Sequence, residues 1–329
     1  YSDGYRDGAP ATVEMIFLSY SATQLLSYQP QRIPSKKTIP QPPHICLTAL
    51  MARTIVALHA HPDDEASKGA GTVARYSDEG VRTVLVTATG GEAGDILNPA
   101  ADSPEARADL AAVRRTELLD AAAIIGYDDV VMLGYRDSGM PDTEENRHPL
   151  AFVNASFEEI LGRLVAIVRS EQPEVILGYD DHERYPHPDH LRIHDLSEAV
   201  FVAAADPERF PDAGEPWAAG RLYAPAFSLK RIRLLGRAMS DRGLESPFGR
   251  WIAGIDPDAE DPPLTQVEVG AYLERARSAQ RAHRTQIDPD GPWFQIPSDV
   301  ILSVYPYEDF ELMAARDGVQ PDGMGLFSS

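Results

Sequence analysis

Cysteine, positive charge and long apolar runs are scarce in this chain of 329 residues. Cys46 is its one cysteine, so an intrachain disulfide and a cysteine-rich zinc site are excluded, and a reducing cytoplasm fits. The 30 Lys and Arg against 51 Asp and Glu give a formal charge of -21, which argues against nucleic acid or anionic membrane as a partner. No apolar run approaches the roughly 20 residues of a membrane helix. We therefore expect a globular cytoplasmic protein that binds a small molecule; its oligomeric state does not follow.

The first fifty residues differ from the rest. The stretch from Gln29 to Pro43 is polar and dense in proline, which favours disorder over a packed core. Met51 lies just before the first apolar run. We predict that residues 1–50 are a disordered extension and that the functional protein begins near Met51.

From Arg53 to about residue 205 strand and helix patterns alternate. Expected strands cover residues 54–58, 81–87, 130–133 and 175–178, and expected helices cover residues 67–79, 103–126, 157–170 and about 190–205. This alternation predicts an α/β fold, a Rossmann-like parallel sheet with helices on both faces, for residues 51–205.

Residues 206–329 have a less regular pattern. A short strand over 222–229, helices over 234–241 and 266–284, and a loop-rich tail are expected there. No repeat or linker marks an independent unit. We predict a smaller C-terminal cap that packs on the sheet edge and completes a pocket.

Two polar clusters follow two of the expected strands. His61, Asp63 and Asp64 come directly after the first strand, and His187 and His190 follow the fourth. Ligands of parallel sheets bind beyond the carboxyl ends of the strands, so the two clusters are expected to form one divided site.

The residue types in this site indicate metal-assisted hydrolysis. His61, Asp64 and His190 offer two imidazoles and one carboxylate, the ligand set of a catalytic zinc ion with an open position. The same ligands suit ferrous iron. Asp63 is left over beside the ligands, where a general base is needed. As an imidazolium, His187 is placed to stabilise an oxyanion or to protonate a leaving amine.

Other interpretations of the same residues stay open. A single His-Pro-Asp loop is more often a turn with a capping Asp. A dinucleotide-binding sheet needs Gly-x-Gly-x-x-Gly after the first strand, whereas here that turn is acidic and Gly90, Gly91 and Gly94 follow the second strand. A metal-holding module without catalysis is the third alternative.

Charged residues elsewhere add candidates. Arg114 and Glu117 share the apolar face of the second helix, either as a buried pair or as groups at the pocket, where Arg114 would hold a substrate hydroxyl or acidic group. Asp137 follows the third strand, in a turn or at the pocket rim. Asp189, Glu117 and His194 are expected to support the metal ligands rather than to touch the metal.

The paired motifs, His61 to Glu65 and His187 to His190, resemble the two signatures of the LmbE and PIG-L family of zinc-dependent N-acetylglucosaminyl deacetylases. The resemblance extends from Arg53 to about Pro306. It implies amide hydrolysis on an amino sugar, with zinc at His61, Asp64 and His190. It also implies base catalysis by Asp63 and electrostatic help from His187. The segment around His283 is similar to a family segment near the site.

Within this family, further stretches are similar to the branch that hydrolyses mycothiol S-conjugates. This similarity implies release of an N-acetylcysteine S-conjugate, a mercapturic acid, and glucosaminyl-inositol in thiol-dependent detoxification. It adds Lys68, Glu92 and Tyr185 to Arg114 and Asp137 as expected substrate-binding residues, although Lys68 by itself is typical of a solvated surface. The alternatives are deacetylation of N-acetylglucosaminyl-inositol in mycothiol biosynthesis, another LmbE-type N-deacetylation, or a non-catalytic metal- or sugar-binding module.

Overall fold

An eight-stranded mixed sheet forms the framework of the described residues, in the order β1-β4-β3-β2-β5-β6-β8-β7. The computed structural model describes residues 31–34, 53–180, 186–249, 256, 258–316 and 324–327. The strands are β1 (Gln31–Pro34), β2 (Thr54–His59), β3 (Arg82–Thr89), β4 (Asp129–Tyr135), β5 (Val175–Leu177), β6 (Arg221–Ala226), β7 (Leu264–Glu268) and β8 (Tyr307–Ala315).

Helices cover this sheet and extend its loops. The α-helices are α2 (Asp64–Ser67), α3 (Ala70–Asp78), α4 (Pro104–Ala108), α5 (Leu110–Ile125), α6 (Glu144–Arg147), α7 (Phe157–Glu171), α8 (Pro188–Ala203), α9 (Leu229–Asp241), α11 (Leu273–Ala282), α12 (Pro292–Gln295) and α13 (Ser298–Val304). Short 3-10 helices are η1 (Phe152–Asn154), η2 (Pro211–Ala213) and η3 (Gly270–Tyr272). Within the described residues, every helix is too short or too polar to traverse a lipid bilayer.

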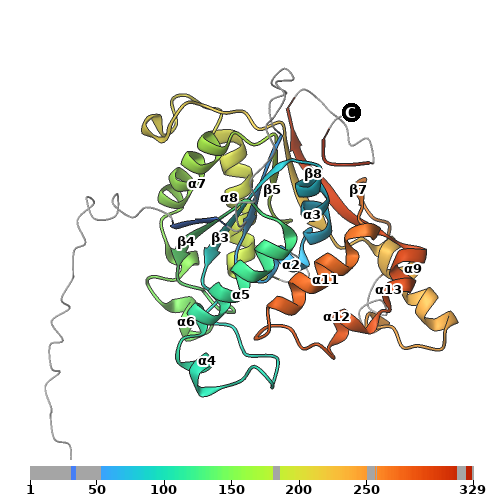
Figure 1. The fold of residues 1–329 in the computed structure, drawn as a ribbon. Helices are drawn as coiled ribbons and strands as arrows, with labels where there is room; N and C mark the ends of the chain where they lie inside the picture. The colour runs from blue at the N-terminus through green and yellow to red at the C-terminus, as the bar shows by residue number, and fades with distance from the viewer. Residues whose placement is uncertain are drawn as a thin grey trace, which may run out of the picture. The chain divides into compact units, whose positions relative to one another are not determined.

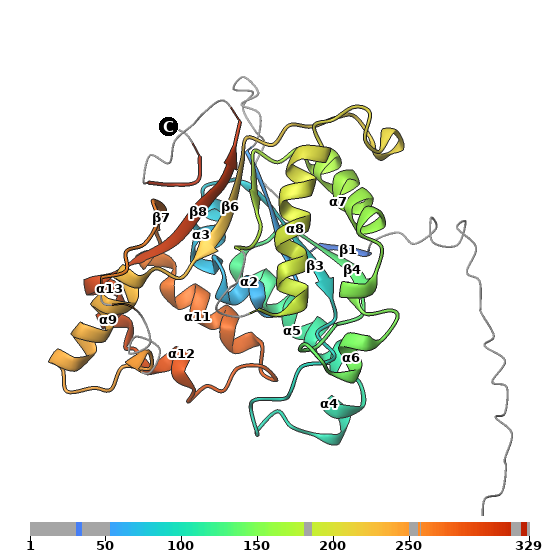
Figure 2. The same ribbon diagram turned by 180° about the vertical axis from the view of Figure 1, so that it is seen from behind.

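The predicted fold class is confirmed. Strands β4, β3, β2, β5 and β6 are parallel to one another, while β1, β8 and β7 pair antiparallel at the two edges. β2 is buried on both faces, as its continuous apolar run predicts. Val56 and Leu58 pack with residues of α7 and α8, whereas Ile55 and Ala57 pack with residues of α3, α5 and α11. Figure 1 looks onto α3, α5 and α11, and Figure 2 onto α7 and α8.

Two predicted helices are each divided in the structure. Of the helix expected over residues 67–79, Ser67 ends the short helix α2 and residues 70–78 form α3. Gly69, whose φ of 93° is left-handed, separates the two. The helix expected over residues 103–126 is interrupted at Asp109. This residue leaves the helical conformation at φ -149° and accepts a hydrogen bond from the Ala112 amide as the N-cap of α5.

The predicted helix over residues 266–284 is wrong in its first part. Residues 264–268 form β7, in which buried Thr265 and Val267 alternate with half-buried neighbours, and the helix α11 begins only at Leu273. A period of two is the strand pattern, and pairing with β8 satisfies its backbone. β8 lies in the expected loop-rich tail, so β6, β7 and β8 continue the sheet of the first 205 residues. The division at residue 205 stays a prediction.

The segment before Met51 contributes one strand. Residues 31–34 form β1, the edge strand, which pairs with β4. The other residues of the predicted extension lie outside the part of the chain that the structure describes.

A carboxylate from β8 caps the helix that follows the first polar cluster. Glu308 accepts hydrogen bonds from the amides of Gly71 at 3.0 Å and Thr72 at 2.8 Å, while the N-cap Gly69 has no side chain to do so. Replacing Glu308 with Ala is expected to lower the free energy of unfolding by about 1 kcal/mol and Tm by about 2–4 °C in thermal unfolding. Glu79→Ala, which removes an exposed ion pair from the same helix, is the control, with little change expected.

Candidate metal centre

The two polar clusters meet at the point where the strand order reverses. β2 lies between β3 and β5. After β2 the chain adds β3 and β4 on one side of it, and then crosses to add β5 and β6 on the other side. His61 follows the carboxyl end of β2, and His187 and His190 lie at the start of α8, which follows β5. This is the ligand-binding position of an open α/β sheet.

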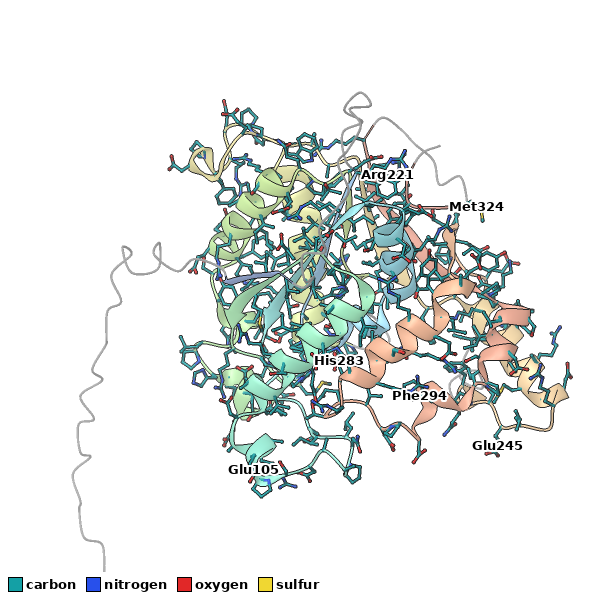
Figure 3. The ribbon with its side chains drawn as sticks, viewed as in Figure 1. Glu105, Arg221, Glu245, His283, Phe294 and Met324 are labelled. Carbon is teal, nitrogen blue, oxygen red and sulfur yellow. The ribbon has the colours of Figure 1, made fainter. Side chains whose placement is uncertain are left out.

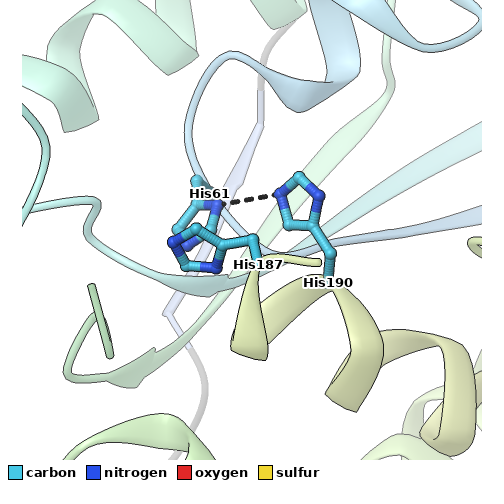
Figure 4. Close-up of side chains that lie close together, drawn as sticks. All are labelled: His61, His187 and His190. Carbon is cyan, nitrogen blue, oxygen red and sulfur yellow. Dashed lines mark hydrogen bonds between the residues drawn. The ribbon is translucent and has the colours of Figure 1, made fainter. Parts of the chain in front are cut away.

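Three imidazoles converge there (Figure 4). His61 Nδ1 lies 3.2 Å from His190 Nε2, and the rings of His61 and His187 are 4.5 Å apart between centroids. Each of the three offers a nitrogen within 4.8 Å of the others, so the cluster is able to hold a metal ion. All three side chains are buried.

The carboxylate of Asp64 joins the same cluster. Its oxygens lie 3.5 Å from His61 Nδ1 and 3.4 Å from His190 Nε2. The two imidazoles and one carboxylate expected as ligands are therefore adjacent. Lys68, one helical turn along, donates to Asp64 Oδ1 at 2.5 Å, so this lysine reaches the site through a predicted ligand.

The other edge of the His61 ring faces two more carboxylates. His61 Nε2 is 3.1 Å from Asp189 Oδ2 and 3.5 Å from Asp137 Oδ1. Asp189 is itself held by the Ser138 amide at 3.0 Å. A carboxylate on the far nitrogen sets the tautomer of a ligating histidine, so Nδ1 is left to face His190 and Asp64. The supporting role expected of Asp189 stays a prediction.

The protonation states of two of the three predicted ligands fit a divalent cation. Burial lowers the pKa of His190 to about 3, which leaves a neutral imidazole. Burial by itself raises the pKa of Asp64, but Lys68 and His190 hold it well below its usual value. Burial by itself lowers the pKa of His61, but hydrogen bonds to the three surrounding carboxylates raise it well above its usual value. Neutral imidazole and ionised carboxylate are the forms that bind metal, so His190 and Asp64 are already in that form, whereas His61 has to release a proton when a metal ion binds.

Asp63 is held beside this cluster in a strained conformation. Its φ of 115° is rare for a residue other than glycine and places it at the N-cap of α2. Arg114 Nη2 donates to Asp63 Oδ2 at 3.0 Å and to the Pro62 carbonyl at 2.5 Å. Burial raises the pKa of Asp63, while Arg114 opposes the shift. The carboxylate thus combines a fixed position with increased basicity.

His187 is a neutral hydrogen-bond donor. Its Nδ1 accepts from the Asp189 amide at 3.2 Å as the N-cap of α8, which leaves the proton of the neutral ring on Nε2. Burial and the neighbouring His61 lower the pKa of His187. Its expected help to an oxyanion therefore requires Nε2–H rather than an imidazolium.

The remaining candidates take positions around the cluster, and their expected roles stay predictions. Glu92 accepts from the Asp137 amide at 3.3 Å, and the buried Asp137 accepts from Ala93 at 3.2 Å. His194 is 2.9 Å from the Tyr179 carbonyl. Tyr185 lies outside the described residues.

Arg114 and Glu117 point to different partners. Besides Asp63 and Pro62, Arg114 donates to the Gly91 carbonyl at 2.5 Å, so it joins the loops that follow β2 and β3. Glu117 accepts from the amide and hydroxyl of Thr285 at 3.0 and 2.7 Å.

Two contributions were missed from the sequence. Tyr179 lies two residues after the end of β5. Its hydroxyl is 3.1 Å from His59 Nδ1, and its ring is 4.9 Å from that of His190 between centroids. Its place at a strand end was the available signal. Glu65, the last residue of the first motif, is 2.5 Å from His283 Nε2. No local pattern links residues 218 positions apart.

The support that Asp189 gives to His61 is open to measurement. Asp189→Asn is expected to weaken metal affinity by about 10- to 100-fold, because the far nitrogen of His61 loses the nearer of its two carboxylate partners. Competition with a chelator measures this change. Asp195→Asn, an exposed carboxylate on the same helix, is the control and should bind metal as wild type does; equal affinities in the two variants would contradict the assignment.

Fold and cluster together define an α/β protein with a candidate metal centre at the switch point of its sheet. Residues 56–201 match the PIG-L family model, described as GlcNAc-PI de-N-acetylase. The chain is 39% identical over 267 residues to the mycothiol S-conjugate amidase of Streptomyces coelicolor, covering 78% of this chain and 90% of the relative.

Two other similarities agree. The chain is 36% identical over 281 residues to the 1D-myo-inositol 2-acetamido-2-deoxy-alpha-D-glucopyranoside deacetylase of Geodermatophilus obscurus, covering 81% of this chain and 94% of the relative. The fold is similar to that of N,N'-diacetylchitobiose deacetylase from Pyrococcus horikoshii, with a TM-score of 0.56 and 22% identity over 80% and 84% of the two chains. The chain belongs to the PIG-L/LmbE family of deacetylases and amidases.

Proposed function

We propose that this protein is a metal-dependent amidase that cleaves the amide bond of mycothiol S-conjugates. The products are an N-acetylcysteine S-conjugate and glucosaminyl-inositol. The observation that carries the proposal is the convergence of His61, Asp64 and His190 beside the carboxylate of Asp63. The 39% identity to a relative named for this activity supports the choice of substrate.

His61, Asp64 and His190 are the residues that would hold the metal ion, either Zn²⁺ or Fe²⁺. A bound divalent cation supplies Lewis-acid chemistry, acidifying water and polarising the amide carbonyl. His187 offers a further nitrogen to the same cluster, but its role here is that of a donor. Asp189 orients His61 from the far side of the ring.

Asp63 acts as the general base in this mechanism. Its carboxylate takes a proton from the attacking water, and the oxygen adds to the amide carbonyl. The C–N bond then breaks, and the amine leaves with a proton that Asp63 returns to it. Arg114 keeps the carboxylate in place through both transfers. His187 donates from Nε2 to the oxygen that gains charge.

The second candidate function is deacetylation of N-acetylglucosaminyl-inositol. A specific observation favours it, since relatives named as the inositol acetamido-glucopyranoside deacetylase share 36% and 37% identity over 94% and 96% of their length. Both reactions hydrolyse an amide on the same amino sugar. The chemistry assigned to Asp63 and the metal ligands therefore serves either substrate, and the acyl group distinguishes them.

The test is hydrolysis of both substrates by one preparation whose metal content is measured. We expect kcat/KM for a mycothiol S-conjugate to exceed that for N-acetylglucosaminyl-inositol by at least about tenfold, a selectivity equivalent to about 1.4 kcal/mol. Removal of metal by a chelator should abolish both activities, and addition of Zn²⁺ or Fe²⁺ should restore them.

Each other outcome changes a different part of the proposal. Preference for the acetylated sugar would favour the second candidate. Metal binding without hydrolysis of either amide would contradict both substrates and retain the metal centre. Hydrolysis that persists in metal-free protein would contradict the mechanism.

A further inference from the structure

Glu65 follows the predicted ligand Asp64 in the chain and forms a fully buried polar pair with His283. His283 Nε2 is 2.5 Å from Glu65 Oε1, and neither side chain is exposed to solvent. His283 lies at the C-terminal end of α11, 218 positions after Glu65 in the sequence (Figure 3). Its other nitrogen, Nδ1, is buried without a hydrogen-bond partner among the described residues.

The second oxygen of Glu65 contacts the backbone of the proposed base. Glu65 Oε2 accepts a hydrogen bond from the Asp63 amide at 3.0 Å. An acidic side chain near the start of a helix that binds the amide of the N-cap residue resembles half of a capping box. Here the N-cap residue is Asp63, whose φ of 115° is unfavourable for a residue with a side chain. Glu65 thus stabilises the conformation that Asp63 adopts.

Asp63 is held from two directions as a result. Glu65 binds its amide, and Arg114 binds its carboxylate at 3.0 Å. Arg114 comes from α5, whereas the partner of Glu65 comes from α11. A buried carboxylate keeps a defined orientation only when its oxygens are hydrogen-bonded, and His283 and the Asp63 amide each bind one oxygen of Glu65.

We infer that Glu65 and His283 are positioning residues that hold Asp63 in its reactive orientation. This role rests on the proposed function of Asp63 as general base. It makes the C-terminal part of the chain a contributor to the chemical step as well as to the fold. Misplacing a reacting group by about 1 Å costs on the order of 100-fold in rate, so the pair is expected to affect kcat.

The test compares four variants with wild type for kcat, KM and metal content. Glu65→Ala and His283→Ala are expected to lower kcat by about 30- to 100-fold with KM within about threefold and metal content unchanged. Glu65→Gln keeps an acceptor for the Asp63 amide and should recover most of the lost rate. Glu171→Ala is the control, because it removes a buried carboxylate paired with Arg82 at the opposite end of the sheet. It should lower stability without changing kcat.

A double-variant comparison separates positioning from a general loss of structure. If Glu65 acts through Asp63, Glu65→Ala should cause no further loss in an Asp63→Ala background. Three results would overturn the inference. They are an equal fall in kcat in both backgrounds, a rise in KM with kcat unchanged, and a fall in kcat of the same size in Glu171→Ala.

If Glu65→Ala does not fold, Glu65→Gln and His283→Ala decide by the same criteria. Wild-type hydrolysis measured alongside tests the proposed function separately, and a crystal structure of Glu65→Gln reports the conformation of Asp63 directly.

Discussion

Asp63→Ala is expected to lower kcat for amide hydrolysis by about 10²- to 10⁴-fold while the protein keeps its metal. Arg114 binds the Asp63 carboxylate, and the Glu65 side chain accepts a hydrogen bond from the Asp63 backbone amide. Its removal takes away the proton acceptor but leaves His61, Asp64 and His190 in place. Steady-state kinetics together with metal analysis measures both effects.

Asp142→Ala is the matched control for this variant. Asp142 is exposed and also has a left-handed φ, of 68°, so the control removes a carboxylate from a similar backbone conformation outside the cluster. Its rate should equal that of wild type. Near wild-type turnover by Asp63→Ala would refute the base assignment, and loss of metal in that variant would place Asp63 among the ligands.

His190→Ala is expected to lose metal altogether, with affinity reduced by more than the roughly 100-fold that loss of a supporting residue costs. The ring of His190 lies within 3.5 Å of both other predicted ligands, and its low pKa of about 3 keeps it in the neutral form that binds metal. Hydrolysis should disappear with the metal. Metal analysis after dialysis gives the first readout, and activity gives the second.

His194→Ala tests whether this effect is specific. His194 lies one turn further along α8 and contacts the backbone carbonyl of Tyr179 at 2.9 Å. Loss of a supporting residue weakens metal affinity by about 10- to 100-fold at most, so we expect His194→Ala to retain more metal than His190→Ala. Should both variants lose metal equally, disruption of α8 would explain the result better than ligation would. Retention of metal by His190→Ala would indicate instead that His187 is one of the metal ligands.

The sequence by itself determined the parallel centre of the sheet and the place of the site. The apolar run before His61 is too short for a helix and is buried on both faces, and alternation with helical patterns requires parallel neighbours. Carboxyl ends of parallel strands share one edge, so polar residues after β2 and β5 had to meet there. The convergence of His61, Asp64 and His190 follows from this geometry.

Only the tertiary structure decided what surrounds these residues. The contact of Arg114 with Asp63, the carboxylates on the far side of His61, and the link from Glu65 to His283 join segments between 51 and 218 positions apart. Such contacts leave no local periodicity. The same reason explains β7, a short segment that became a strand because β8 pairs with it. Local patterns define which elements form, whereas packing between distant elements defines which atoms touch.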